Sequence, residues 1–529
     1  MSAKFYEDTT DGIVPWTATY TYPSQASKTW KYVTKLPPVN GNSFSNTANQ
    51  AIQINFPAQS YLNCKNSFLQ FDLTMTVPAS GWANVRFQNN IQSIFSRARL
   101  LYGSYVIEDL QDYNILVRAI TEATNSNQNN GINQESINDG IAGLDIVGFS
   151  EVGITTGPLA TATAIGTGYV NGRLGAIQGS NFSASALHVT GGAPLIPDGT
   201  EGTTSCTRRY CVQLYLGAFL QEKLIPLKWM ASQLQLWLEL APSKSCMCAT
   251  KWTTGTEPSY TLTNVNYLAE FYDFDAAYDE GFLQGLKKGV PIKFGSWDRF
   301  IHPANTAKVT NFYPERNRSI KAAICVQIAN KVGYGHAASG AELGQATDSH
   351  AFVQSSTGIT ATSFKSTAGS MLNSYQWRVG QKYYPSQPVT CNLDTTKTNG
   401  AGEAYLELAK ALKIVGDYKF NGGITSKRWC PTSGAATQLV VSSVADWAGV
   451  DCQLATDQDV TLAGPSYFVI AADFETSDGA EISGINGEEQ NDIALNIDYN
   501  DVQDGTFYTF IYFDELLILG ENNRVQVVK

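Results

Sequence analysis

Apolar and polar residues alternate with a period of two along many segments of the chain. The clearest runs are Ile52–Phe56, Leu69–Val77, Leu234–Leu240, Ile320–Ile328 and Ile493–Tyr499. Alternation of this kind places one face of a β-strand against a core and leaves the other face polar. The pattern therefore predicts an all-β protein built from antiparallel sandwiches.

Two short helices interrupt these strands. The first is expected to begin near Asp109, with Leu110, Tyr113 and Val117 at helical spacing, and the second spans Glu403–Ile414. In each half of the chain, strands are followed by a helix, then by a long polar excursion, then by more strands. This common order predicts two similar sandwiches of about eight strands each, the size of a jelly roll.

The long excursions are rich in Gly, Ser, Thr and Ala, and they set the expected organisation of the chain. We interpret them as surface insertions, because long segments of this kind inside a compact domain usually carry function. The predicted organisation is an N-terminal arm at 1–45, a first jelly roll at 46–280 with an insertion at about 124–206, and a second jelly roll at 281–529 with excursions at about 331–369 and 415–463.

Composition limits the possible functions. Of the 529 residues, 43% are hydrophobic and only 16% are charged, and the net charge is −11. Intrinsic disorder would need the opposite balance. Nucleic-acid binding needs clustered Lys and Arg, which the chain lacks, so we expect no direct contact with a genome. The start of the chain has no secretory pattern, and nine cysteines without repeated spacing indicate reduced thiols in a protein that folds inside a cell.

Four cysteines are the best candidates for a metal site. Cys206, Cys211, Cys246 and Cys248 form two pairs that could supply four thiolates to zinc. The usual spacing of two residues between paired ligands is absent, and Cys211 falls within a strand pattern. Buried or loop thiols are the favoured interpretation, although pairing or metal binding of these four stays open.

Other candidate chemistry is equally weak. The acidic cluster of Asp273, Asp275, Asp279 and Glu280 fits no calcium loop, and we interpret it as a solvated connection. Four histidines are expected in loops: His188, His302, His336 and His350. Gly148–Gly153 is a near-match to a serine nucleophile motif. Three tryptophans close to the carboxylate of Glu239 could suggest a sugar site: Trp229, Trp237 and Trp252.

None of these groups forms a convincing constellation. We therefore assign no catalytic, cofactor-binding or metal-binding residue, and we expect no cofactor and no enzymatic activity.

Three segments resemble double jelly-roll major capsid proteins. Ile94–Asn114 reads IFSRARLLYGSYVIEDLQDYN and is similar to the hairpin and helix of that family. Gly217–Leu240 contains LIPLKWM, which looks like the family's K-L-[IL]-P-L turn before an alternating strand. Tyr375–Pro388, followed by AYLELAKAL from Ala404, resembles the strand and helix of the second half. The resemblance covers roughly residues 45–529 and is closest to virophage and polinton-like virus capsid proteins.

The resemblance implies a major capsid protein of a double-stranded DNA virus, located in the virion and assembled inside the host cell. It implies a homotrimer whose six sandwiches form a pseudo-hexagonal capsomer, with neighbouring capsomers, penton and minor capsid proteins as partners. Low charge suits this role, because burying charge at an interface is costly. The excursions would form an outer turret and the N-terminal arm would lie along the inner base. Which loops contact a host surface stays open.

Two other functions stay open. A β-sandwich carbohydrate-active enzyme or binding protein would be a monomer with a carboxylate-lined cleft and commonly an export signal. A different virion component, such as a minor vertex protein, would more commonly have a single jelly roll.

Overall fold

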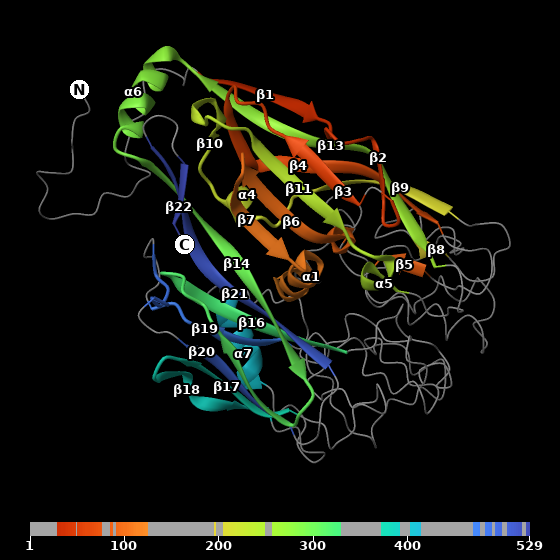
Figure 1. Cartoon of the computed structure of the whole chain (residues 1–529), viewed down its shortest axis with the longest axis vertical. Coiled ribbons are helices and arrows are strands. Elements are labelled where there is room, and N and C mark those ends of the chain that lie inside the picture. Colours follow the sequence, from red (N-terminus) through yellow and green to blue (C-terminus); the bar gives the residue numbers. More distant parts are fainter. Residues whose placement is uncertain are drawn as a thin grey trace, which may run out of the picture.

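Two β-sandwiches joined by one helix make up the described part of the chain (Figure 1). The computed structural model describes residues 29–48, 50–76, 85–87, 91–124, 195–196, 205–248, 257–329, 372–391, 402–413, 469–476, 482–488, 492–499, 505–520 and 525–528. Most of each of the three long excursions predicted from the sequence lies outside these residues, and so do residues 1–28 of the predicted arm.

The first sandwich packs two large sheets against each other. The strands of the first sheet, which we call sheet A, are β1 (Thr29–Leu36), β2 (Ser43–Ser45), β4 (Tyr61–Thr76), β9 (Ser205–Val212), β10 (Ile225–Pro226) and β13 (Ser259–Phe274). Those of sheet B are β3 (Ala51–Asn55), β6 (Phe95–Tyr102), β7 (Tyr105–Gln111) and β11 (Leu234–Leu240). A small third sheet joins β5 (Val85–Phe87), β8 (Leu195–Ile196) and β12 (Met247–Cys248).

The second sandwich also has two sheets. Sheet E contains β14 (Val290–Ala304), β16 (Ile320–Ala329), β19 (Ile470–Asp473), β21 (Gly505–Leu519) and β22 (Val525–Val528). Sheet F contains β15 (Lys308–Tyr313), β17 (Leu372–Val379), β18 (Lys382–Thr390) and β20 (Ile493–Tyr499). Tyr313 of sheet F lies between the sheets, where its hydroxyl is 3.0 Å from the Thr509 hydroxyl of sheet E.

Strand order is the same in both sandwiches. In the first sandwich we number the eight main strands in chain order as β1 together with β2, then β3, β4, β6, β7, β9, β11 and β13, and in the second sandwich they are β14 to β21. Sheets A and E then both have the order 1-8-3-6, and sheets B and F both have the order 2-7-4-5. This is the connectivity of a jelly roll, whose two sheets exchange strands through Greek-key connections. The predicted fold class, two consecutive jelly-roll sandwiches with short helices, is confirmed.

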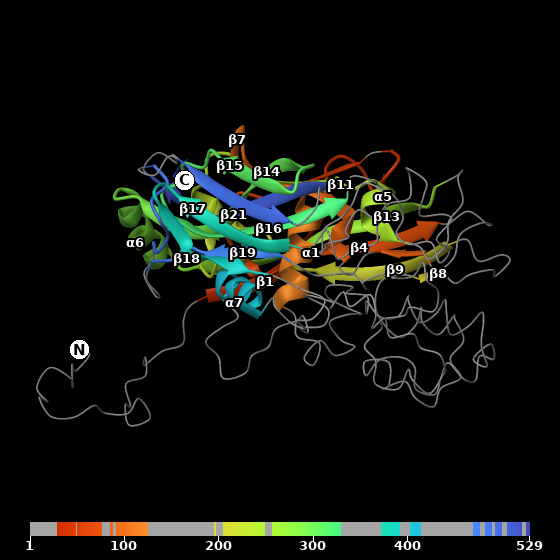
Figure 2. The same ribbon diagram turned by 90° about the horizontal axis from the view of Figure 1, so that it is seen from below.

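Helices cover the edges and ends of the sandwiches. α1 (Tyr113–Thr124) and α7 (Gly402–Ala411) each follow the fifth main strand of their sandwich, and α7 packs on β19 (Figure 2). Shorter pieces are α4 (Gly217–Leu220), α5 (Ser243–Cys246) and the 3-10 turns η2 (Ile91–Ile94) and η6 (Leu227–Trp229). The two helices therefore hold equivalent places in the strand order of their sandwiches, as the sequence predicted. Their tyrosines differ in environment, because Tyr113 is fully buried whereas Tyr405 is only half-buried.

Part of the predicted N-terminal arm belongs to sheet A. β1 pairs with β13 over eight consecutive residues, from Thr29 opposite Phe274 to Leu36 opposite Tyr267. Residues 29–36 and 43–45 of the predicted arm are therefore strands of the first sandwich. The sequence missed β1 because its side chains are exposed on both faces, which removes the alternation of burial.

The first helix begins later than predicted. Asp109 does not cap it but lies in β7, where its carboxylate binds Arg97 of β6 with both oxygens, at 2.7 and 2.6 Å. Asp112 has a φ of 49° and turns the chain from β7 into α1. The segment Gln221–Met230 contains the short strand β10 and the 3-10 turn η6.

The predicted connection between the halves is a helix. α6 (Ala276–Leu286) forms despite Gly281 and Gly285, because Asp275 caps its first turn by accepting a hydrogen bond from the Tyr278 N–H at 3.1 Å. Tyr278 and Phe282 of this helix pack their rings edge-on against Tyr61. Figure 1 shows α6 at one end of the molecule, between β13 and β14.

Candidate assembly surfaces and the junction between the sandwiches

A buried carboxylate joins the two sandwiches. Glu108 of β7 is fully buried and accepts hydrogen bonds from the backbone N–H groups of Gly217 and Ala218 at 2.8 and 3.1 Å. The Ser296 hydroxyl of β14, in the second sandwich, donates to the same carboxylate at 3.3 Å. Burying a carboxylate is tolerated when hydrogen bonds replace its water. Glu108 therefore ties β7 and α4 of the first sandwich to β14 of the second.

At this point Gly217 lets the backbones of the two sandwiches meet, and Gly295 makes room for the Tyr512 ring within the second sandwich. A Cβ atom on Gly217 would lie 1.6 Å from the Gly295 carbonyl oxygen, and one on Gly295 would lie 1.9 Å from the Tyr512 hydroxyl. Tyr512 also packs against Trp297, with 4.8 Å between ring centroids, and burial raises the pKa of Tyr512 to about 12. No larger residue fits at either glycine, so the spacing of the sandwiches is fixed by direct contact.

An ion pair closes the other side of the junction. Arg299 of β14 donates to the Asp112 carboxylate at 2.6 Å and also to the side-chain oxygen of Gln111. Burial raises the pKa of Asp112, and the charge and hydrogen bond of Arg299 oppose that shift. The two sandwiches are thus held by a carboxylate clamp, a glycine contact and an ion pair along β14.

The strand registers place α6 at the end of each sandwich opposite to long connections. In sheet A, Ser205 pairs with Thr76 at the end far from Phe274, where α6 begins. In sheet E, Ala329 pairs with Gly505 at the end far from Val290, where α6 has ended. The chain therefore enters β9 at Ser205 at the end of the first sandwich that lies away from α6. It leaves β16 at Ala329 at the end of the second sandwich that also lies away from α6.

Comparison with solved structures finds viral capsid proteins. The chain is 9% identical to PBCV-1 VP54 fitted into a reconstruction of the virophage Sputnik (97% of this chain, 99% of that one, TM-score 0.49). It is 11% identical to a chain of the Sputnik virophage (98% and 93%, TM-score 0.49) and 8% identical to the mavirus major capsid protein (98% and 95%, TM-score 0.46). No family model and no curated protein sequence matches the chain.

Exposed apolar side chains lie on several separate elements. On β1, Trp30 is 62% and Val33 is 60% exposed, and on the β7 hairpin Tyr105 is 68% exposed. α6 presents Tyr278 and Leu283. Large exposed apolar groups on a folded domain mark contact surfaces when they gather on one face.

Such a gathering occurs on the outer face of sheet F. Phe312, Ala494, Arg378 and Tyr383 are paired in one row across its four strands. Phe312 and Tyr383 are about half exposed, and the Arg378 guanidinium lies 5.9 Å from the centre of the Phe312 ring. This row, which we call the sheet F row, exposes two aromatic rings and one guanidinium on the surface of the second sandwich, with the buried Ala494 between them.

The equivalent face of sheet B is polar and internally neutralised. Arg99 donates to Glu239 at 2.8 Å and stacks on Trp237, and Arg97 binds Asp109. Glu239, the carboxylate considered in the sequence for a sugar site, is therefore engaged by arginine. Charges that are already paired cost less to bury at an interface than free charges do.

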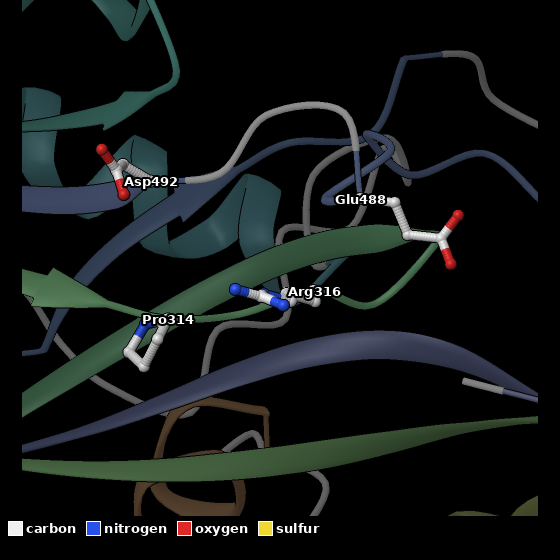
Figure 3. A pocket seen from close by; sticks show the side chains of 4 residues that line it. All are labelled: Pro314, Arg316, Glu488 and Asp492. Carbon is white, nitrogen blue, oxygen red and sulfur yellow. The ribbon is translucent and has the colours of Figure 1, made fainter.

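The described residues contain one shallow pocket of note, with a volume of about 550 Å³. Pro314, Arg316, Glu488 and Asp492 line it, and Figure 3 shows the Glu488 carboxylate pointing away from Arg316. Glu488 instead accepts a hydrogen bond from Arg318 at 3.1 Å. The polar groups do not converge on a common point, which a small-molecule site would require.

The sequence candidates for metal binding are dispersed. Cys246 is buried, and its thiol donates to the Pro242 carbonyl oxygen at 3.4 Å, whereas Cys211 lies on β9 opposite Gln70. The side chains of Cys206 and Cys248 lie outside the described set. Among the described residues, no three His, Cys, Asp or Glu side chains gather as a metal site would need.

The remaining candidates have structural partners. His302 lies in β14 rather than in the predicted loop, with its Nε2 atom 3.1 Å from the Phe312 carbonyl oxygen, and burial lowers its pKa. Trp229 donates to the Tyr61 hydroxyl at 2.8 Å, and Lys228 binds Asp279. His188, His336, His350, Trp252 and the Gly148–Gly153 motif lie outside the described residues.

No sequence pattern marked Glu108 as the central junction residue. It sits within the segment that resembles capsid proteins, but its partners are 109 and 188 positions away along the chain. Only folding brings them together. Within the described ranges, no helix is long and apolar enough to cross a membrane.

Proposed function

We propose that this protein is a major capsid protein that self-associates into trimeric, pseudo-hexagonal capsomers, which tile the icosahedral shell of a double-stranded DNA virus. The observation that carries the proposal is the repeated strand order, 1-8-3-6 and 2-7-4-5, in two sandwiches held together by one junction. Three copies of such a chain supply six similar wedges, which is what a closed threefold ring with a hexagonal outline needs.

The surfaces of the molecule support self-association. The sheet F row exposes Phe312 and Tyr383, and its Arg378 guanidinium lies over the Phe312 ring. The ion pairs on sheet B are satisfied within the chain, so burial of that face against a neighbour leaves no unpaired charge among them. In this proposal the role of the chain is structural, and no residue has a catalytic role.

Location and partners follow from this role. The protein resides in the virion after assembly in the host cell, and its partners are neighbouring capsomers, penton proteins and minor capsid proteins. The net charge of −11 supports the view that a different, basic protein contacts the genome. The proposed domain boundary at residues 280 and 281 falls within α6.

Measurement of the mass of the purified chain tests the proposal. We expect a particle of three times 57.5 kDa that persists on dilution, with a six-lobed outline in negative-stain electron microscopy. A stable monomer would contradict the proposal, and a monomer that cleaves polysaccharide would establish the enzyme alternative. A vertex protein would form pentamers or single spikes and no lattice.

A further inference from the structure

The outer edge of β1 is open. β1 is the terminal strand of sheet A, and in the described part of the chain no strand pairs with its second edge over Trp30–Leu36. Trp30 and Val33 lie on opposite faces of this strand and are both more than half exposed. An edge strand that exposes apolar side chains on both faces offers a ready template for another strand.

The usual protections of an edge strand are weak here. Proteins guard such edges with a bulge, a proline or outward lysines. β1 pairs with β13 without any register shift and contains no proline. Of its two lysines, Lys31 forms an ion pair with Glu270, with 2.7 Å between its Nζ atom and the carboxylate, and lies near the Tyr272 ring. Only Lys35 remains to screen the edge.

A segment with the sequence pattern of a β-strand precedes β1. Trp16–Tyr22 reads WTATYTY, in which large apolar and threonine residues alternate. This composition has high β-propensity, and Pro15 and Pro23 bound the segment at both ends. The six residues 23–28 that join this segment to Thr29 can span about 20 Å when extended, which is enough to reach a molecule packed beside β1.

We propose that Trp16–Tyr22 of one copy adds as a strand to the open edge of β1 in a second copy. Backbone hydrogen bonds would supply the affinity, and the exposed Trp30 and Val33 would pack on alternate side chains of the incoming strand. A fold-back within one chain is disfavoured, because the connection 23–28, PSQASK, has no Gly, Asn or Asp for a hairpin turn. The inference rests on the proposed self-association and specifies one of its contacts.

Cross-linking between differently labelled copies tests the exchange. Full-length chains that carry only Thr19→Cys are mixed with full-length chains that carry only Val33→Cys, and a short bis-maleimide is added. We expect a two-chain band that is at least tenfold stronger than the band from either variant mixed with the unsubstituted chain. Phe312→Cys, a similarly exposed position on sheet F, replaces Val33→Cys as the matched control and gives no such band.

Two results would overturn the inference. One is the absence of the two-chain band while the mass still shows a trimer, which leaves the proposed function intact. The other is cross-linking only within a single chain that carries both cysteines, which would show a fold-back. A two-chain band without trimers would instead count against the proposed function alone.

A pair of exposed valines gives a second readout. Val33→Lys places a charge on the open edge, whereas Val39→Lys changes a valine of similar exposure that lies beyond the end of β1. The cross-linking pair is Thr19→Cys in one copy and Lys35→Cys in the other. We expect Val33→Lys to reduce the yield of the two-chain band at least tenfold and Val39→Lys to leave that yield unchanged. Equal yields would contradict the role of β1.

Discussion

Gly217 and Gly295 show how single residues set the distance between the two sandwiches. Their missing side chains allow the backbone of α4 to touch that of β14, and the Tyr512 ring to lie against the Gly295 Cα. A glycine in the interior of a strand usually weakens it, and it is often found where another chain segment approaches closely. At Gly295 the approaching group is the Tyr512 ring of the neighbouring strand β21, and the α4 backbone from the other half of the chain reaches the Gly295 carbonyl oxygen.

Gly217→Ala is expected to destabilise the protein. Its Cβ atom would meet a backbone carbonyl oxygen, which cannot rotate away, so we expect a loss of at least about 3 kcal/mol in the free energy of unfolding. Gly281→Ala, in an open part of α6, is the control and is expected to stabilise by about 0.5–1 kcal/mol. Urea unfolding measures both, and equal effects would contradict the contact.

At the scale of elements, sheet E contains a buried network of charges. Lys321 of β16 lies 3.2 Å from Asp514 and 3.3 Å from Glu475, and Lys413, just after α7, also binds Glu475. The Ser483 hydroxyl donates to Glu475 as well. The network connects β16, β21 and the segments next to α7 and β19, which are far apart in the sequence.

This network predicts a dependence of stability on pH. Burial by itself raises the pKa of Glu475, but hydrogen bonds from Lys413 and Ser483 and the charge of Lys321 outweigh it and lower the pKa to about 2. A carboxylate whose pKa is depressed by folding stabilises the protein above its ordinary pKa of 4.5, and this contribution is lost as the pH falls toward 2.

Urea midpoints measured between pH 7 and pH 2 test the prediction. We expect the difference between the natural chain and Glu475→Gln to be largest above pH 4.5 and to shrink steadily below it. Glu488→Gln removes a half-exposed partner of Arg318 and is the control, with little effect at any pH. A constant difference for Glu475→Gln would show that its ionisation is not coupled to folding.

At the scale of the whole molecule, Glu108 couples the two jelly rolls. Its carboxylate receives two backbone N–H groups from the first sandwich and a hydroxyl from the second. In the proposed trimer each chain would contribute one such junction, so a change of the angle between its two halves would be repeated three times around the ring. The clamp helps to fix that angle.

Glu108→Ala is expected to uncouple the halves. Each buried donor left without an acceptor costs about 1–3 kcal/mol, so we expect a loss of about 3 kcal/mol or more and a calorimetric transition that splits in two. Glu108→Gln retains one oxygen acceptor and loses less. Glu222→Ala removes a side chain that is 81% exposed and is expected to change the stability by less than about 0.5 kcal/mol. A single unchanged transition in Glu108→Ala would contradict the clamp.

The structure also changes how the N-terminal segment should be tested. An arm that lies along the inner base would make deletion of residues 1–40 impair shell assembly more than trimer formation. Because residues 29–36 form β1, that deletion would remove a strand of sheet A and damage the subunit itself. Deletion of residues 1–22 leaves β1 in place, and we expect it to keep the trimer and reduce its further assembly, as measured by sedimentation and electron microscopy.

The sequence by itself determined the all-β class, the two-part plan and the positions of strands such as β11 and β20. These strands bury mainly one face, so the alternation of residues such as Leu236 and Trp237 predicts which side chains are buried. It also placed α7 to within three residues, since Ala404, Leu408 and Ala411 form one buried stripe.

Tertiary structure alone decided the features that depend on distant partners. β16 is buried on both faces, and α6 forms from a glycine-containing segment because Asp275 caps it and Tyr61 packs against it. Glu108 gains its role from groups more than 100 positions away. Local sequence encodes which face of a strand avoids water, but long-range contacts decide which buried carboxylate, glycine or strand edge meets a partner.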